Sequence, residues 1–461
     1  MAENLILAID QGTSATKGLL VDAGGAVVAS GSAPVPIRYP RPGWVEQDAV
    51  EILDSVLAAA GQCLAGVPRG AVTAVGLSTQ RESAVVWDKR TGKPVGPVLG
   101  WQDQRATCAD LRPHADEIRR ISGLPLDPMF SAAKLRWLLE RTPDAAVGTV
   151  DSWLLYALTG NHQIEVGNAS RTQLLDVRTG SWSGELLELF GIPESALPAL
   201  TPSAGALGVI GAAGGVLAGL PITAVLGDSH AALYAHGPGD GVKVTYGTGS
   251  SAMRLVQGTP AGDAVCLTVA WGDPPPRLAA EGNIRSTGAT VAWLADLLGI
   301  TPEAVAALAA GASSDGVHLV PAFGGLAAPW WDDSAVAVIS GLTLGSRAPQ
   351  LARAAVESIA HQVADVVDAM GPAGCLLADG GASGNDDLMR IQADLLGVPV
   401  KRARTTNLSA LGAAFLAAGR PPPPIAYDEF QPGPGDRAAA RAAWRDAVAR
   451  ACTPSAPHPG S

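Results

Sequence analysis

The sequence predicts an α/β protein made of two similar halves. Two segments, 5–21 and 242–256, each contain a short apolar run, a polar turn with glycine, and a second apolar run, which is the pattern of a β-hairpin. A hairpin that is repeated in this way indicates an internal duplication. Strand-like and helix-like segments alternate elsewhere in both halves, and such alternation is typical of layered α/β folds.

In the first half, short apolar runs predict three further strands, at 72–77, 84–87 and 222–226. Apolar residues at helical spacing predict a helix over 132–141. The segment 236–241, HGPGDG, is rich in glycine and proline and has the composition of a linker. We therefore expect a first domain over 1–238 and a second over 239–452.

In the second half, a long amphipathic pattern predicts a helix over 348–370 that ends at a Gly-Pro pair. A buried strand is expected at 375–378, and a last helix at about 437–451. The final residues, 453–461, have the composition of a disordered tail.

Charge and hydropathy exclude several kinds of partner. The 461 residues carry a net charge of −11, and no run of basic residues is longer than fragments such as Lys401-Arg402. Nucleic acids and anionic membranes select basic surfaces, so neither is an expected partner. Mean hydropathy is +0.21, but no apolar stretch approaches the roughly 20 residues of a membrane span. The acidic start of the chain does not resemble a signal peptide, which predicts a cytoplasmic protein.

The cysteines and histidines do not form a known metal pattern. Five cysteines are scattered without C-x-x-C spacing, and the seven histidines contain no H-x-x-x-H pair. A disulfide framework and a thiolate zinc site are therefore disfavoured. Any bound metal is expected to be a hard cation held by oxygen atoms.

The two hairpin turns have the chemistry of phosphate sites. The first contains Asp10, Gly12, Thr13 and Ser14, so it offers a carboxylate, a close backbone approach and donor groups to a phosphate with its Mg²⁺. The second, at 247–251, repeats the glycine and hydroxyl pattern. A plain β-turn with an Asx hydrogen bond is the alternative for either turn alone. The sequence contains no P-loop, dinucleotide fingerprint or nucleophile elbow.

Three other segments carry candidate site residues. The glycine-rich stretch 379–385 is a possible seat for adenine and ribose, or else a strand-to-helix turn with a helix cap. Arg81 and Glu82 follow a strand and suit the hydroxyls of a polyol, unless they form a surface ion pair. Trp101 is either an aromatic wall or core. Asp228 is a candidate general base, and it also suits a helix cap.

Taken together, these segments resemble the FGGY family of carbohydrate kinases, and within it most closely the glycerol kinases. The resemblance covers almost the whole chain in the same order, at 8–18, 80–95, 100–105, 123–139, 168–176, 227–233, 245–251, 320–332 and 379–400. It implies a two-domain actin-like ATPase (ribonuclease H-like) fold with an interdomain cleft. It also implies ATP and Mg²⁺ in the cleft, and transfer of the γ-phosphoryl group to a hydroxyl of a small polyol or sugar.

The resemblance assigns roles position by position. Asp228 matches the general base, and Asp10 matches the acid associated with Mg²⁺; we expect both near the metal. Arg81, Glu82 and Trp101 match the set that contacts the acceptor, within the first domain. The nucleotide contacts match Gly12, Thr13, Ser14, Lys17, Gly247, Thr248, Gly288, Gly381 and Asn385. Many glycerol kinases have arginine at the position of Lys17. Lysine presents a compact point charge there instead of the planar guanidinium group of arginine.

Two departures concern the acceptor. Glycerol kinases have a tyrosine where this chain has Met129, and a glutamine where it has Ser229. Because loss of a hydrogen-bonding partner for a substrate hydroxyl reduces discrimination, we expect a preference shifted towards a four- or five-carbon polyol or ketose. Glycerol itself, another acceptor such as xylulose or gluconate, and a non-catalytic sugar-sensing protein are the alternatives. A homodimer or homotetramer is expected by family analogy alone.

Overall fold

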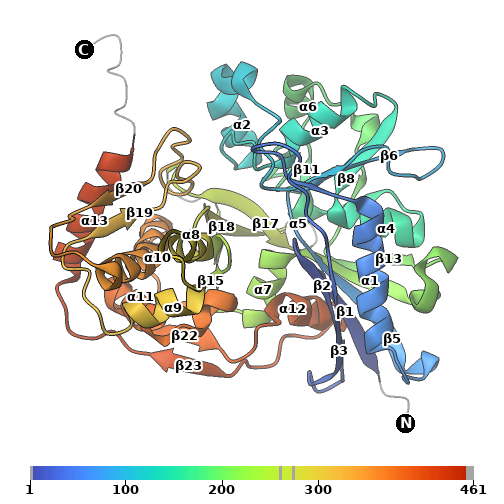
Figure 1. Cartoon of the computed structure of the whole chain (residues 1–461). Helices are drawn as coiled ribbons and strands as arrows, with labels where there is room; N and C mark the ends of the chain where they lie inside the picture. The colour runs from blue at the N-terminus through green and yellow to red at the C-terminus, as the bar shows by residue number, and fades with distance from the viewer. Residues whose placement is uncertain (1–3, 259–261, 273–275, 453–461) are drawn as a thin grey trace.

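The computed structural model describes residues 4–258, 262–272 and 276–452. The expected tail at 453–461 lies outside the described residues. Two lobes, each built on its own large sheet, lie side by side (Figure 1). Strands from the first part of the chain form one sheet, and strands from 242 onwards form the other.

The first sheet has six strands in the order β13-β14-β5-β1-β2-β3. Their bounds are β1 Leu5–Gln11, β2 Ala15–Val21, β3 Val27–Pro34, β5 Val72–Thr79, β13 Ala204–Val209 and β14 Pro221–Gly227. Strands β1 and β2 form an antiparallel hairpin in which Asp10 is opposite Lys17. Strands β1, β5 and β14 are parallel, so their carboxyl ends meet at one edge of the sheet.

The second sheet has seven strands in the order β17-β18-β16-β15-β21-β22-β23. Their bounds are β15 Val242–Tyr246, β16 Ser250–Val256, β17 Cys266–Trp271, β18 Arg277–Ile284, β21 Leu376–Asp379, β22 Val400–Ala403 and β23 Tyr427–Phe430. Strands β15 and β16 repeat the hairpin of the first sheet, and β15 pairs in parallel with β21. The expected duplicated hairpin is therefore confirmed.

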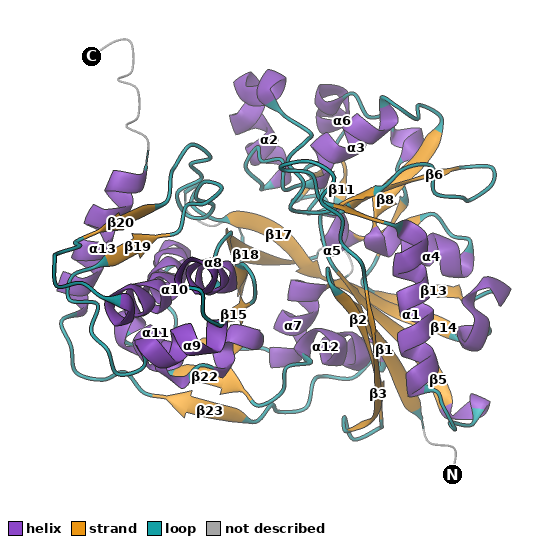
Figure 2. Ribbon diagram, viewed as in Figure 1, coloured by secondary structure: helices purple, strands orange, loops and turns teal. Residues whose placement is uncertain are grey.

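Smaller strands and the helices complete the two lobes (Figure 2). The short strands are β4 Glu46–Gln47, β6 Ala84–Asp88, β7 Val98–Leu99, β8 Ala145–Thr149, β9 Gln163–Glu165, β10 Leu175–Asp176, β11 Ser181–Trp182, β12 Ala199–Thr201, β19 His318–Val320 and β20 Val338–Ser340. The helices are α1 Ala49–Cys63, α2 Ala115–Ser122, α3 Ser131–Leu139, α4 Val150–Thr159, α5 Val166–Ala169, α6 Gly184–Phe190, α7 Asp228–His236, α8 Gly288–Leu298, α9 Pro302–Ala309, α10 Ala348–Met370, α11 Asp386–Leu396, α12 Leu408–Ala417 and α13 Arg437–Ala451.

The elements expected from the apolar pattern are present, and the α/β class is confirmed. Helix α10 has the expected bounds, whereas α3 ends at Leu139, two residues before the expected end, because Glu140 already takes the C-cap position. Among the described residues, no single helix is both long and apolar enough to cross a membrane. A pair, α8 with α9, passes that test only jointly and is bent by 97°.

Helix α12 lies far along the chain but packs on the first sheet. Phe415 and Leu411 contact apolar residues of β1 and β2, in a cluster that includes Ala8 and Leu19. In Figure 1 this helix lies beside α7, to the left of β1 and β2 of the first sheet. It packs against α7 and against β1, β5 and β14, so a segment from the second half of the chain completes the first lobe.

A buried carboxylate next to the first sheet gives a pH-dependent stability prediction. Glu165 caps α5 by accepting hydrogen bonds from two backbone N–H groups and from Ser203, and it has no cationic partner among the described contacts. Burial raises the pKa of its carboxyl to about 7. Because this pKa is higher in the folded than in the unfolded state, the protonated Glu165 side chain contributes to the free energy of unfolding. The contribution is fully present below about pH 4.5 and is lost as the pH rises through about 7.

We therefore expect the wild type to lose stability relative to the Glu165→Gln variant as the pH rises. Between pH 4.5 and pH 8 the free energy of unfolding of the wild type, relative to the variant, should fall by about 3 kcal/mol. Chemical denaturation of both proteins at each pH measures this difference. A difference that stays constant across that range would contradict the raised pKa.

Candidate active site

The three parallel strands of the first sheet bring the candidate chemistry together. Asp10 lies near the end of β1, Arg81 follows β5, and Asp228 follows β14. These strands are neighbours, so their ends form one polar edge that faces the second lobe. Arg81 Nε lies 3.2 Å from the Asp228 carboxylate, which confirms that these two segments meet.

Asp10 is an oxygen donor with an unusual environment. Its carboxylate accepts a hydrogen bond from Ser78 Oγ at 2.8 Å. Burial raises the pKa of its carboxyl to about 6, and the negative charge of Asp228 adds to that rise. The hydrogen bond from Ser78 and, less strongly, the charge of Lys17 oppose the rise. Two carboxylates at neighbouring strand ends are suited to a hard divalent cation such as Mg²⁺.

The first hairpin turn is tied to the cleft wall. Gly12 N donates to Ala15 O at 3.0 Å, which closes the turn. Trp101 Nε1 donates to Thr13 Oγ1 at 3.0 Å, and Gln47 fixes the Thr13 carbonyl. Ser14 and Lys17 are exposed beside them. The structure thus brings these predicted residues together, and Trp101 contacts the first hairpin turn directly.

The second hairpin turn is held by the start of α8. Gly247 N donates to Gly249 O at 2.9 Å, and Gly288 N donates to Gly247 O at 3.0 Å. A Cβ on Gly288 would lie 2.7 Å from that carbonyl oxygen, so only glycine permits this approach. Thr248 remains exposed at the tip of the turn.

The glycine-rich segment after β21 contains a helix cap and, beside it, an open backbone surface. Asn385 caps α11, because its side-chain oxygen accepts from two backbone N–H groups. The cap uses the oxygen and not the amide nitrogen. No atom lies within 4 Å of the position of a Cβ on Gly381 or Gly384, so the surface there is open. The cap alternative is confirmed, and an open backbone surface beside it suits a planar ring.

Arg81 and Glu82 are buried, so the surface ion-pair alternative is wrong. Their side chains are 5% and 7% exposed, and they bond to other partners rather than to each other. Arg81 pairs with Glu281, and Glu82 accepts from Arg171 Nε at 2.6 Å. Glu82 has a φ of 62°, a left-handed conformation that is unusual for this residue. Such a backbone at a cleft is typical of a functional position.

Asp228 is the first residue of α7, and it is not the cap. Gly227 takes the N-cap position, so the capping role expected for Asp228 is wrong. A Cβ on Gly227 would collide with the Arg81 side chain at 2.4 Å, which explains glycine there. The Asp228 side chain is 40% exposed to the cleft and accepts from Ser229 N at 2.6 Å. A partly exposed carboxylate in this place can accept a proton from a bound hydroxyl.

Met129 lies on a loop that a buried lysine holds. Lys134 Nζ donates to the carbonyl groups of Pro128, Met129 and Phe130. Next to Met129, a cavity of about 730 Å³ extends along the junction of the lobes. It is bounded by Trp101, Met129, Gln104, Asp127, Arg285, Phe323 and Asp333, among others.

Sequence reasoning missed several charged residues that lie near the candidate site residues. Arg171 and Glu281 are fully buried, and Asn283 accepts from Arg171 at 3.0 Å. Arg285 bridges Asp127 and Asp333 at 2.5 and 2.7 Å. The signal available in the sequence was the presence of charged residues inside apolar strands and loops, but it does not tell which distant charges pair.

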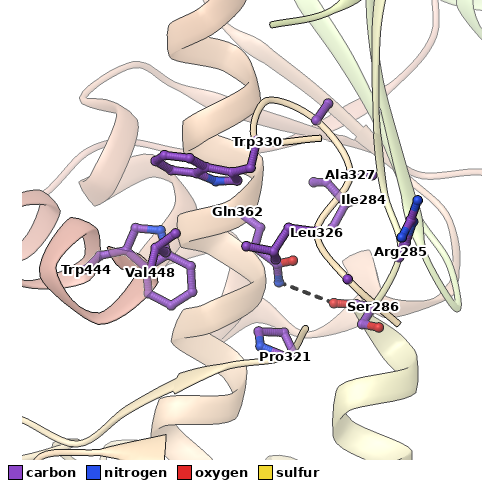
Figure 3. Close-up of a pocket in the computed structure, with 12 residues that line it drawn as sticks. Ile284, Arg285, Ser286, Pro321, Leu326, Ala327, Trp330, Gln362, Trp444 and Val448 are labelled. Carbon is purple, nitrogen blue, oxygen red and sulfur yellow. Dashed lines mark hydrogen bonds between the residues drawn. The ribbon is translucent and has the colours of Figure 1, made fainter. Parts of the chain in front are cut away.

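A second, much smaller cavity belongs to the second lobe. Figure 3 shows it between α10 and α13, with Trp444, Val448 and Trp330 around it. Gln362 Nε2 donates to Ser286 O across it at 3.2 Å. Its volume of about 10 Å³ is just enough for one water molecule. Among the described residues, no cluster of three or more Asp, Glu, His or Cys side chains forms a metal site.

Sequence comparison gives a consistent family. The N-terminal domain of the FGGY family of carbohydrate kinases matches residues 5–235, and the C-terminal domain of that family matches residues 242–419. The chain is 43% identical over 441 residues to an apulose kinase of Pectobacterium atrosepticum, covering 89% of this chain and 88% of that one. It is 42% identical over 464 residues to a glycerol kinase of Alkalilimnicola ehrlichii, covering 93% and 94%.

Structural comparison agrees. The crystal structure of Plasmodium falciparum glycerol kinase with ADP superposes with a TM-score of 0.87. The two chains are 26% identical, and the match covers 98% of this chain and 99% of that one. The expected two-domain actin-like fold is thereby confirmed.

Proposed function

Because this chain belongs to the FGGY family of carbohydrate kinases, we propose that it phosphorylates a terminal hydroxyl of a four- or five-carbon polyol or ketose, using ATP and Mg²⁺. The phosphotransferase activity follows from the family. The size of the acceptor and the roles of individual residues are our proposal, as is the division into closing domains at 1–238 and 239–452.

The cavity beside Met129 supports the larger acceptor. Its volume of about 730 Å³ lies in the usual range of ligand pockets, about 300–1,000 Å³, so an acceptor with four or five carbons fits within it. Its walls combine Trp101 with polar groups of Gln104, Asp127 and Arg285. Further hydroxyl or carbonyl groups of an acceptor would find hydrogen-bonding partners there.

The proposed reaction uses positions already described. The two hairpin turns, with Thr13 and Thr248, bind the phosphates, while Lys17 adds positive charge. Gly381 and Asn385 lie where the adenine ring binds. Asp10 and Asp228 would hold Mg²⁺, which would supply positive charge against the phosphates. Arg81, Glu82 and Trp101 orient the acceptor, and Asp228 accepts the proton of the attacking hydroxyl.

A panel of acceptors tests the proposal. ADP release should be measured with glycerol, dihydroxyacetone, erythritol, threitol, erythrulose, xylitol, xylulose, gluconate and apulose. We expect the highest kcat/KM for an acceptor with four or five carbons. A kcat/KM for glycerol that equals or exceeds all of these would contradict the proposal. Glycerol is the second candidate, because the chain keeps Arg81 and Glu82 and is similar to a glycerol kinase.

Met129 is expected to set part of this preference. Met129→Tyr would place a hydroxyl in the acceptor site, so kcat/KM for glycerol relative to the best larger acceptor should rise about tenfold. Steady-state kinetics with both acceptors measures the ratio. Met129→Leu, which keeps an apolar side chain of similar size, is the control and should leave the ratio unchanged. An unchanged ratio in Met129→Tyr would remove Met129 from the specificity determinants.

Two further expectations stay predictions. Family analogy predicts a homodimer or homotetramer, which light scattering on the purified protein tests. A cytoplasmic location is also a prediction, which cell fractionation tests.

A further inference from the structure

One carboxylate of the second lobe lies inside the charge network of the acceptor side. Glu281, in β18, is fully buried. Its two oxygen atoms form a bidentate pair with Arg81 at 2.7 and 2.9 Å. The same carboxylate lies 2.9 Å from Arg171 NH1. Both arginines belong to the first lobe, so a single residue of one lobe holds two cations of the other.

The remaining contacts fix the orientation of that carboxylate. Ser251 Oγ donates to it at 3.0 Å, and Asn283 Nδ2 donates to it at 3.1 Å. Burial alone raises the pKa of the Glu281 carboxyl, but the adjacent Arg171 and Arg81 outweigh burial and hold that pKa well below its ordinary value. Glu281 is therefore ionised throughout the neutral range.

The network continues from Glu281 to the residues proposed to bind the acceptor. Arg81, held by Glu281, reaches Asp228 through Nε at 3.2 Å. Arg171, also held by Glu281, donates through Nε to Glu82 at 2.6 Å. Glu281 is thus linked to Asp228 through Arg81 and to Glu82 through Arg171.

We propose that Glu281 is a positioning residue of the acceptor site, which orients Arg81 directly and Glu82 through Arg171. The inference rests on the proposed acceptor site. Because Glu281 comes from the second lobe and both arginines from the first, the acceptor groups are ordered only when the lobes are correctly placed against each other. Without its charge, the two arginines have Glu82 and Asp228 as their remaining anionic partners, and both of these groups are needed by the acceptor.

The decisive variant is Glu281→Gln, assayed with the best acceptor of the panel. We expect KM for the acceptor to rise about tenfold or more, while KM for ATP changes less than about threefold. A purely structural ion pair would lower thermal stability without this separation of the two KM values. Unchanged KM for the acceptor in a folded Glu281→Gln protein would overturn the inference.

Two further variants keep the test decisive. Glu281→Asp retains the charge but reaches the arginines less well, so its KM for the acceptor should lie between the wild type and Glu281→Gln. If Glu281→Gln does not fold, a wild-type KM in Glu281→Asp overturns the inference.

Asp365→Asn is the matched control: Asp365 is also a buried carboxylate of the second lobe, paired with Arg441 and Trp444. It should lower Tm and leave both KM values unchanged.

Arg81→Ala separates this inference from the proposed function. If Arg81→Ala leaves KM for the acceptor unchanged, the proposed acceptor site is wrong, and the role of Glu281 fails with it. If Arg81→Ala raises that KM and Glu281→Gln does not, only the inference about Glu281 fails.

Discussion

Replacement of Asp228 by asparagine is expected to reduce kcat by about 10³-fold or more, while the affinity for ATP changes little. A positioned general base contributes about 10² to 10⁴ in rate, and Asp228 is also expected near the metal. The amide oxygen of asparagine can still accept from Ser229 N, as the carboxylate does. Arg81 stays anchored by Glu281. The fold should therefore survive the change, and the loss should appear in the chemical step.

Steady-state ADP release and calorimetric ATP titration measure the two quantities separately. Asp116→Asn is the matched control, because Asp116 is an exposed aspartate in the first turn of α2 and makes no contact with the proposed site. It should keep wild-type kcat. If Asp228→Asn retains more than about a tenth of wild-type kcat, Asp228 is not the base.

The position of Asp228 shows how far sequence reasoning reaches. Its carboxylate follows an apolar strand, and parallel strands place their carboxyl ends at one edge, so its proximity to Arg81 was predictable. The helix boundary was not, since Gly227 is the cap for a reason that involves a distant residue: a Cβ there would strike Arg81. The local sequence pattern around Gly227 gives no information about that contact with Arg81.

The same limit applies to the acceptor network. Arg81 and Glu82 are adjacent in sequence, which favours the simple expectation of a mutual or surface ion pair. Their actual partners are 200 and 89 positions away, Glu281 and Arg171. Pairing of buried charges that are far apart in sequence depends on the tertiary fold, and for Arg81 with Glu281 also on how the two lobes meet. Neither periodicity nor composition encodes either arrangement. The packing of α12 on the first sheet escapes the sequence pattern for the same reason.

Asp10→Asn is expected to reduce kcat by about 10²-fold or more and to raise the Mg²⁺ concentration needed for half-maximal rate. The reason is electrostatic. Phosphoryl transfer depends on positioned groups and on neutralisation of phosphate charge, and a neutral amide is a weaker ligand for a hard cation than a carboxylate. The hydrogen bond from Ser78 can be retained by the amide oxygen, so the turn itself should keep its geometry.

A Mg²⁺ titration of the rate at saturating ATP and acceptor tests this expectation. Asp88→Asn is the control, since Asp88 also ends a strand and orders the turn after it, but on the exposed side of the first lobe. It should change neither kcat nor the Mg²⁺ requirement.

The stability of the ligand-free protein gives an independent readout. Burial and Asp228 make the ionised Asp10 carboxylate unfavourable in the absence of ligands, so Asp10→Asn should not lower Tm at pH 8 even though activity is lost. A fall in both Tm and kcat, with an unchanged Mg²⁺ requirement, would instead make Asp10 a structural residue of the hairpin.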